Sequence, residues 1–283
     1  MPLTVAHPVV AVPFRKLGLL LSPLIVGSII PDFEFFLRLS TQRLIAHTPL
    51  GLFLFCIPVG LLSLLLFHKV LKFPLISVLP KKHREKLLPV AREFTFLPLS
   101  RFFNIVMSLL VGAVSHIVFD ALTHSGSFLT TYISWFDLPL FYLFGNPVRV
   151  YFFLQYLFSA IGVLALMHWY WSWYKGAQRE RCVWGHHFPG GKRALFVSAI
   201  AFCTVFGGAF YGILTSYHLR SIGMVREFVS NAAIASVSSF LLAVLLFAFL
   251  WHWILPTRLK MRLVYRKLKS IDQGEGESVS IEL

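Results

Sequence analysis

The chain has 283 residues, of which 57% are hydrophobic and 13% are charged, and its mean hydropathy is +0.73. Because a soluble domain carries about 25% charged residues, this composition excludes a water-soluble globule. The apolar residues form long, nearly uncharged runs, which indicate segments surrounded by lipid. The formal net charge of +14 lies mostly in short loops beside these runs, where it orients the chain and contacts anionic headgroups, so we expect no nucleic-acid partner.

The N-terminal segment holds two short apolar pieces that are interrupted by Pro13 and Gly18. Proline and glycine between short runs favour a bend over one straight helix. We therefore expect a helical hairpin that enters the membrane and returns, which would bring Asp32 back to the level of His7. The alternative is a single short span over residues 17–30, which would place His7 on the opposite side of the membrane.

Five later segments are each near the length of about 20 apolar residues that a bilayer core requires. They lie at about residues 48–67, 102–123, 151–173, 194–216 and 232–255. The predicted fold class is all-α, a multi-pass transmembrane helical bundle with a short N-terminal helical hairpin. We expect a membrane core over residues 1–150, about three C-terminal transmembrane helices over residues 151–270, and a disordered tail over residues 271–283.

Lysine and arginine are distributed unevenly between the connecting segments. Residues 68–101, 174–193 and 256–283 hold 19 of the 26 basic residues, whereas the other connections hold one or two each. With five spans, these two sets of segments fall on opposite sides of the membrane. The positive-inside rule then predicts that the basic segments and the C-terminus are cytoplasmic.

The second of these five segments, at about residues 102–123, carries a column of polar residues near its outer end. His116, Asp120 and His124 are spaced four residues apart, so on a helix their side chains share one face. Placing an aspartate at the centre of a membrane helix costs about 2.5–3.5 kcal/mol, so such a residue usually has a partner and a function. Two imidazoles beside a carboxylate supply the nitrogen and oxygen ligands that zinc prefers, and a purely structural hydrogen-bonded stack is the alternative.

Further polar residues lie at segment ends that are predicted to meet this column on the outer side. Pro31 ends the N-terminal hairpin and places Asp32 at the interface, and Glu34 follows two residues later. His47 immediately precedes the next apolar segment, and His7 begins the hairpin. We therefore expect these side chains and the column to form one polar cluster.

The order of these motifs resembles that of the zinc-dependent phospholipase C fold, which includes bacterial phospholipases C and the amino-terminal domain of glycosylphosphatidylinositol phospholipase D. The matching stretches are His7, Gly27 to Asp32, His47 and Gly112 to His124. The chain is also similar to membrane-bound metal-dependent hydrolases of bacteria. It is most similar to the bacterial domain-of-unknown-function family 4184, whose members begin with a similar histidine and carry a similar Gly-Ser-x-x-Pro-Asp-Phe-Glu. The resemblance covers about residues 1–150.

The resemblance implies a phospholipase C-like helical core in the first half of the chain. It implies that one zinc ion is bound by Asp32, His47, His116 and Asp120. Asp120 would bridge to a second zinc that His7 also ligates, and His124 would correspond to a further ligand. Since no convincing His-x-x-x-Glu motif follows, we expect one or two metal ions, with other divalent metals as alternatives to zinc. Zinc lowers the pKa of water that it binds toward about 7, so no serine or cysteine nucleophile is required.

Asp120 and Glu34 are the candidate catalytic residues, with Asp137 as another candidate general base. The leading interpretation is a membrane-embedded, metal-dependent hydrolase of phosphoesters, with a lipid or lipid-linked phosphate as its substrate. The alternatives are a non-catalytic membrane scaffold with a structural metal or polar stack, and a metal- or proton-coupled transporter. We expect the protein in the bacterial inner (plasma) membrane, with the site on the extracytoplasmic side and the lipid bilayer as its partner. The sequence identifies no protein partner.

Overall fold

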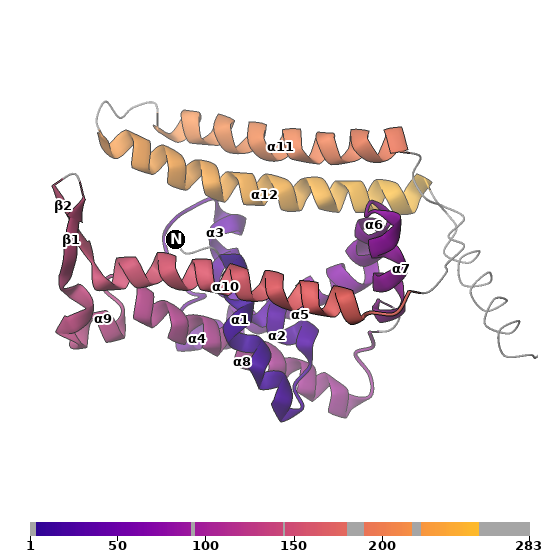
Figure 1. Cartoon of the computed structure of the whole chain (residues 1–283), viewed down its shortest axis with the longest axis horizontal. Coiled ribbons are helices and arrows are strands. Elements are labelled where there is room, and N and C mark those ends of the chain that lie inside the picture. The colour runs from indigo at the N-terminus through magenta and orange to yellow at the C-terminus, as the bar shows by residue number, and fades with distance from the viewer. Residues whose placement is uncertain (1–3, 92–93, 144, 180–189, 217–221, 255–283) are drawn as a thin grey trace, which may run out of the picture.

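The computed structural model describes residues 4–91, 94–143, 145–179, 190–216 and 222–254 (Figure 1). This part of the chain is helical apart from one small antiparallel sheet, which confirms the all-α prediction. The predicted disordered tail lies outside the described residues.

Among the described residues, five helical segments are long and apolar enough to cross a membrane, as the sequence predicted. They are Pro49–Ser77, Leu99–Thr123, Val150–Gly176, Arg193–Ser216 and Glu227–Trp253. The first of them contains the short helices α4 (Pro49–Gly51), α5 (Ile57–Leu66) and α6 (Lys72–Ser77) and the π-helical turns η4 (Leu52–Cys56) and η5 (Phe67–Leu71). The segment that was predicted to be a connector from residue 68 is therefore helical through Ser77. Which end of the bundle faces the cytoplasm stays a prediction.

The N-terminal segment is the predicted hairpin, so the single-span alternative is wrong. Its short elements are η1 (Thr4–Ala6), α1 (Pro8–Ala11), η2 (Val12–Leu17), α2 (Leu21–Gly27) and η3 (Ile30–Asp32). The bend occurs at Gly18, whose φ of +82° lies in the left-handed region that glycine adopts without strain. Asn104 donates its side-chain amide to the carbonyl of Gly18 at 3.1 Å, which attaches the bend to the second of the five spans.

The hairpin lies directly against α8 (Leu99–Thr123), with two glycines at the crossing. A Cβ atom added at Gly112 would lie 2.5 Å from the carbonyl oxygen of Leu24, and one added at Gly27 would overlap the carbonyl of Leu109. Small residues allow such close backbone approach between apolar helices. This crossing fixes the C-terminal end of α2, and therefore Asp32 beyond it, beside α8.

The three long C-terminal helices are α10 (Val150–Gly176), α11 (Gly190–Ser216) and α12 (Ile222–Ile254). Helices α11 and α12 form an antiparallel pair, and α12 faces the rest of the bundle (Figure 1). α12 packs on α3 (Phe33–Arg38). Ser238 donates a hydrogen bond to the carbonyl of Phe36 at 2.7 Å, and Tyr211 donates to that of Leu39 at 3.0 Å. The C-terminal pair therefore holds the end of α3.

The remaining elements are short. They are α7 (Lys81–Val90), α9 (Phe128–Tyr132), η6 (Ser134–Asp137) and the strands β1 (Pro139–Leu143) and β2 (Asn146–Arg149). The two strands form a hairpin between α8 and α10, at the end of the bundle where α8 ends (Figure 1). Every residue of β1 is exposed, including Leu140, Phe141 and Tyr142. An exposed apolar and aromatic strand at the end of two spans is typical of a membrane–water interface.

Candidate metal centre

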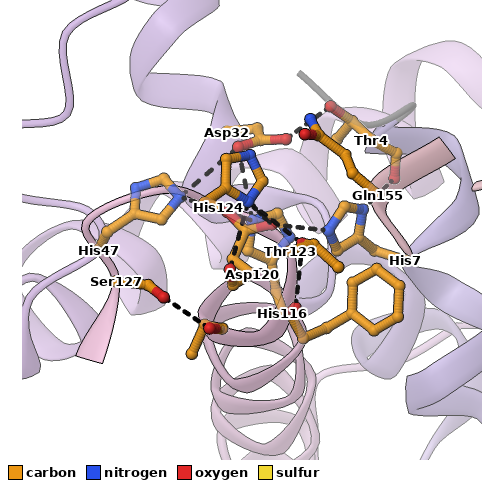
Figure 2. A network of polar contacts seen from close by, with 12 residues as sticks. Thr4, His7, Asp32, His47, His116, Asp120, Thr123, His124, Ser127 and Gln155 are labelled. Atoms are coloured by element: carbon orange, nitrogen blue, oxygen red, sulfur yellow. Dashed lines mark hydrogen bonds and ion pairs between the residues drawn. The ribbon is translucent and has the colours of Figure 1, made fainter. Parts of the chain in front are cut away.

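Four side chains from three separate parts of the chain meet at one point near the end of α8 (Figure 2). Asp32 comes from η3, His47 from the segment that precedes α4, and His116 and Asp120 from α8. One nitrogen or carboxylate oxygen from each lies within 4.8 Å of the others. The structure thus brings together the four residues that were predicted to bind the first zinc ion.

The distances between these atoms are compatible with the ligands of one metal ion. His116 Nε2 lies 3.4 Å from Asp32 Oδ1 and 3.6 Å from Asp120 Oδ2, and His47 Nε2 lies 3.6 and 3.7 Å from the same two oxygens. These separations are too long for hydrogen bonds. Both Nε2 atoms are buried without a hydrogen-bond partner in the part of the chain that the structure describes. In a tetrahedral zinc site with bonds of about 2.0–2.2 Å, ligand atoms lie about 3.3–3.6 Å apart, close to these four nitrogen–oxygen separations.

Contacts beyond these four atoms orient the ligands. His116 Nδ1 lies 2.8 Å from the carbonyl oxygen of Ser28, which requires a proton on Nδ1 and leaves the lone pair on Nε2. Thr4 donates its hydroxyl to Asp32 Oδ2 at 2.6 Å. Burial alone would raise the pKa of Asp32, but the imidazoles of His116 and His47 that face its carboxylate and the hydrogen bond from Thr4 hold this pKa well below its usual range. Asp32 is therefore an anion at neutral pH, as a metal ligand must be.

Glu34 positions the segment that carries His47. Its buried carboxylate accepts hydrogen bonds from the backbone N–H groups of Leu44, Ile45 and Ala46 at 3.1–3.3 Å. Burial alone would raise the pKa of Glu34, but these bonds, assisted by the charge of Arg38, lower it below its ordinary value. The Glu34 carboxylate therefore holds the backbone that leads to His47. A direct catalytic role for Glu34 stays a prediction.

His7 and His124 lie on the other side of Asp120. His7 Nε2 is 3.3 Å from Asp120 Oδ1, and its ring stacks on that of His116 with centroids 4.0 Å apart. His124 Nδ1 is 3.4 Å from the same Oδ1. The two oxygens of Asp120 therefore face two pairs of histidines. This arrangement brings His7 and His124 to the carboxylate that was predicted to bridge two ions, although occupancy by a second ion stays a prediction.

His124 does not continue the predicted helical column. Helix α8 ends at Thr123, and His124 has extended backbone with φ −122° and ψ 138°, so its ring turns back toward Asp120 from beyond the helix. Burial is the main cause that lowers the pKa of His124 to about 4. The negative charge of Asp120 acts in the opposite direction, and the positive charge of Arg43 lowers this pKa further. The imidazole is therefore neutral at pH 7 and able to bind a metal ion.

Three residues at the site were not predicted. Arg43 Nη2 lies 2.5 Å from Asp120 Oδ2, Thr4 contacts Asp32 as described above, and Gln155 of α10 points toward Thr4 and Asp32 (Figure 2). None of the three belongs to a spaced motif, so only the tertiary structure reveals them. Asp137, the other candidate base, instead forms an exposed ion pair with Arg149.

A known protein family matches most of the chain, including the residues of the site. The model of the family described as domain of unknown function (DUF4184) matches residues 1–249. The chain belongs to this family. No curated protein and no solved structure matches the chain. The predicted DUF4184 membership is confirmed, and the match extends beyond the first 150 residues into α12. The resemblance to phospholipases C and to other metal-dependent hydrolases stays a prediction.

The positioning role of Glu34 in this DUF4184 member can be tested by replacing it with glutamine. Glu34→Gln removes the charge that strengthens three backbone hydrogen bonds, so His47 should be held less firmly. We expect zinc affinity, measured by titration of the purified protein, to fall about 10- to 100-fold. Arg38→Gln is the control, because Arg38 is half-exposed and lies 3.7 Å from Glu34, where an ion pair contributes little. Unchanged zinc affinity combined with lost turnover would instead identify Glu34 as a general base.

Proposed function

We propose that this protein is a membrane-embedded, metal-dependent hydrolase of phosphoesters, with zinc held by Asp32, His47, His116 and Asp120. The observation that carries the proposal is the pair of buried Nε2 atoms of His47 and His116, which face two carboxylates at 3.4–3.7 Å. Burying such nitrogens without a partner costs free energy. A divalent cation would offset this cost and the repulsion between the two carboxylates.

Each residue has a distinct part in the proposed centre. When bound, a divalent ion acts as a Lewis acid toward a phosphoryl oxygen and increases the acidity of water at the site. Asp32 and Asp120 supply negative charge, and the Ser28 carbonyl keeps the His116 lone pair directed inward. His7 and His124 flank Asp120 Oδ1, where they hold that carboxylate in place or bind a second ion.

The surroundings of the site favour an amphiphilic substrate. The centre lies near the end of α8, and the connection that follows carries exposed Tyr132, Trp135, Phe141 and Tyr142. Aromatic side chains of this kind are enriched where a bilayer meets water. A lipid or lipid-linked phosphoester could approach such a site from the bilayer, so we propose this substrate class and an extracytoplasmic position for the site.

Metal analysis and turnover of the purified full-length protein test this proposal. We expect one or two zinc ions per chain and metal-dependent hydrolysis within a panel of dioctanoyl phosphatidic acid, dioctanoyl phosphatidylcholine and bis-p-nitrophenyl phosphate. Chelation followed by zinc addition should abolish and restore turnover. Protein that binds no divalent metal would refute the proposal. Bound metal without turnover would support the scaffold alternative, and metal flux into liposomes without turnover would support transport.

A further inference from the structure

Two side chains at the polar cluster are partly exposed. The side chain of Arg43 is 35% exposed and that of His124 is 20% exposed, whereas those of Asp32, His116 and Asp120 are at most 6% exposed. Arg43 and His124 are therefore the members of this set that a molecule outside the cluster can contact most readily.

Arg43 already contacts the inner part of the site. Its Nη2 lies 2.5 Å from Asp120 Oδ2, the same oxygen that faces the Nε2 atoms of His47 and His116. A guanidinium group has five N–H donors in a planar fork. A contact through one nitrogen to one oxygen leaves donors that can bind a second acceptor beside the centre.

The backbone on both sides of Arg43 is anchored. Tyr211 holds the carbonyl of Leu39 at 3.0 Å, and Glu34 binds the N–H groups from Leu44 to Ala46. The segment between these anchors is short, so Arg43 cannot move far from the site. Its long side chain remains the adjustable part, which suits a residue that reaches toward a ligand.

The charges around Arg43 favour an anion once a divalent ion is bound. Asp32 and Asp120 contribute −2, a divalent ion would contribute +2, and Arg43 adds +1, so the sum is +1 with neutral imidazoles. The carboxylate of Glu34 accepts hydrogen bonds from backbone N–H groups and lies 3.7 Å from Arg38, whose opposite charge offsets it. The planar fork of arginine matches the oxygens of a phosphoryl group, to which it forms paired charge-assisted hydrogen bonds.

We infer that Arg43 is the substrate-recognition residue of the site and binds the phosphoryl oxygens of an anionic phosphate or phosphoester beside the metal ion. This inference rests on the proposed function, because it assumes that the four-residue group holds a cation. It narrows that function to substrates with a phosphoryl anion exposed enough to reach Arg43.

The test separates anion binding from metal binding. Zinc affinity is measured by titration, and binding of inorganic phosphate to the zinc-loaded protein is measured by calorimetry. Arg43→Gln should weaken phosphate binding about 10- to 100-fold, while zinc binds at least as tightly because a neighbouring positive charge is removed. Arg43→Lys should retain part of the phosphate affinity through its charge. Arg149→Gln is the matched control, since Arg149 is 39% exposed and pairs with Asp137 away from the centre.

Two lipid probes distinguish the source of the phosphoryl group. Dioctanoyl phosphatidic acid should bind at least as tightly as inorganic phosphate and should lose affinity in Arg43→Gln, whereas dioctanoylglycerol, which lacks the phosphate, should not. Tighter binding of phosphatidic acid than of phosphate would support a lipid substrate, and equal binding would support recognition of the phosphoryl group alone. Unchanged phosphate affinity in Arg43→Gln would overturn the role of Arg43 while leaving the metal centre intact. Failure of the wild-type protein to bind zinc would overturn the proposed function itself.

Discussion

Replacing Asp120 with asparagine is expected to reduce zinc affinity by more than about 100-fold and to abolish turnover. Asp120 is the residue on which the cluster converges, because its Oδ1 faces His7 and His124 and its Oδ2 faces His47 and His116. Asparagine has nearly the same shape but no charge, so the histidines would lose the anion they surround. Bound zinc is measured by elemental analysis after dialysis against a fixed concentration of free metal.

Asp137→Asn is the control for this substitution. Asp137 is 55% exposed, pairs with Arg149 and lies on the segment that follows α8. The same chemical change there should leave both zinc content and turnover unchanged. If Asp120→Asn kept the wild-type zinc content and affinity, the cluster would be a structural hydrogen-bonded network and no metal centre would exist there.

The core of this site could be predicted from the sequence because local rules fix its parts. His116 and Asp120 are four residues apart on an uninterrupted helix, and helical geometry alone places them on one face. Pro31 and Gly18 interrupt the N-terminal helices, which returns Asp32 to the same level as His7. An anion and several imidazoles in an otherwise apolar chain then have few partners other than one another.

The remainder depends on tertiary contacts that have no local signature. Arg43 lies in an irregular segment whose path is determined by the buried carboxylate of Glu34. Gln155 comes from a helix whose face toward the hairpin is set by packing. The position of His124 depends on where α8 ends, and helix ends are the least predictable part of a helix. The helical continuation to Ser77 was missed because its lysines and prolines were interpreted as marks of a connector.

The C-terminal helices α11 and α12 contact the backbone next to the site, although they contribute no ligand to the four-residue group. Ser238 of α12 and Tyr211 of α11 donate to carbonyls of α3 and of Leu39 that follows it. Those carbonyls immediately precede the segment with Arg43 and His47. The DUF4184 match through residue 249 includes both donors. We therefore interpret the C-terminal pair as a support that holds one wall of the site.

Adding a single methyl group at Gly112 is expected to separate the N-terminal hairpin from α8. The new Cβ would lie 2.5 Å from Leu24 O and 2.8 Å from Ser28 N, and these backbone atoms cannot move aside without moving α2. Ser28 also supplies the carbonyl that orients His116. Gly112→Ala should therefore lower the thermal unfolding midpoint in detergent by roughly 5 °C or more and weaken zinc binding at the same time.

Two other glycines provide a graded comparison. At Gly60 the three atoms nearest the added Cβ all belong to the side chain of Leu109, the nearest at 2.8 Å, and a flexible side chain can adjust. At Gly176 it would meet nothing within 4 Å. Gly60→Ala should therefore cost less stability than Gly112→Ala, and Gly176→Ala should cost none, with zinc affinity retained in both. Equal stability and zinc affinity in all three variants would show that the close approach of α2 and α8 is not what holds Asp32 beside His116, because of these three substitutions only Gly112→Ala would force the two backbones apart.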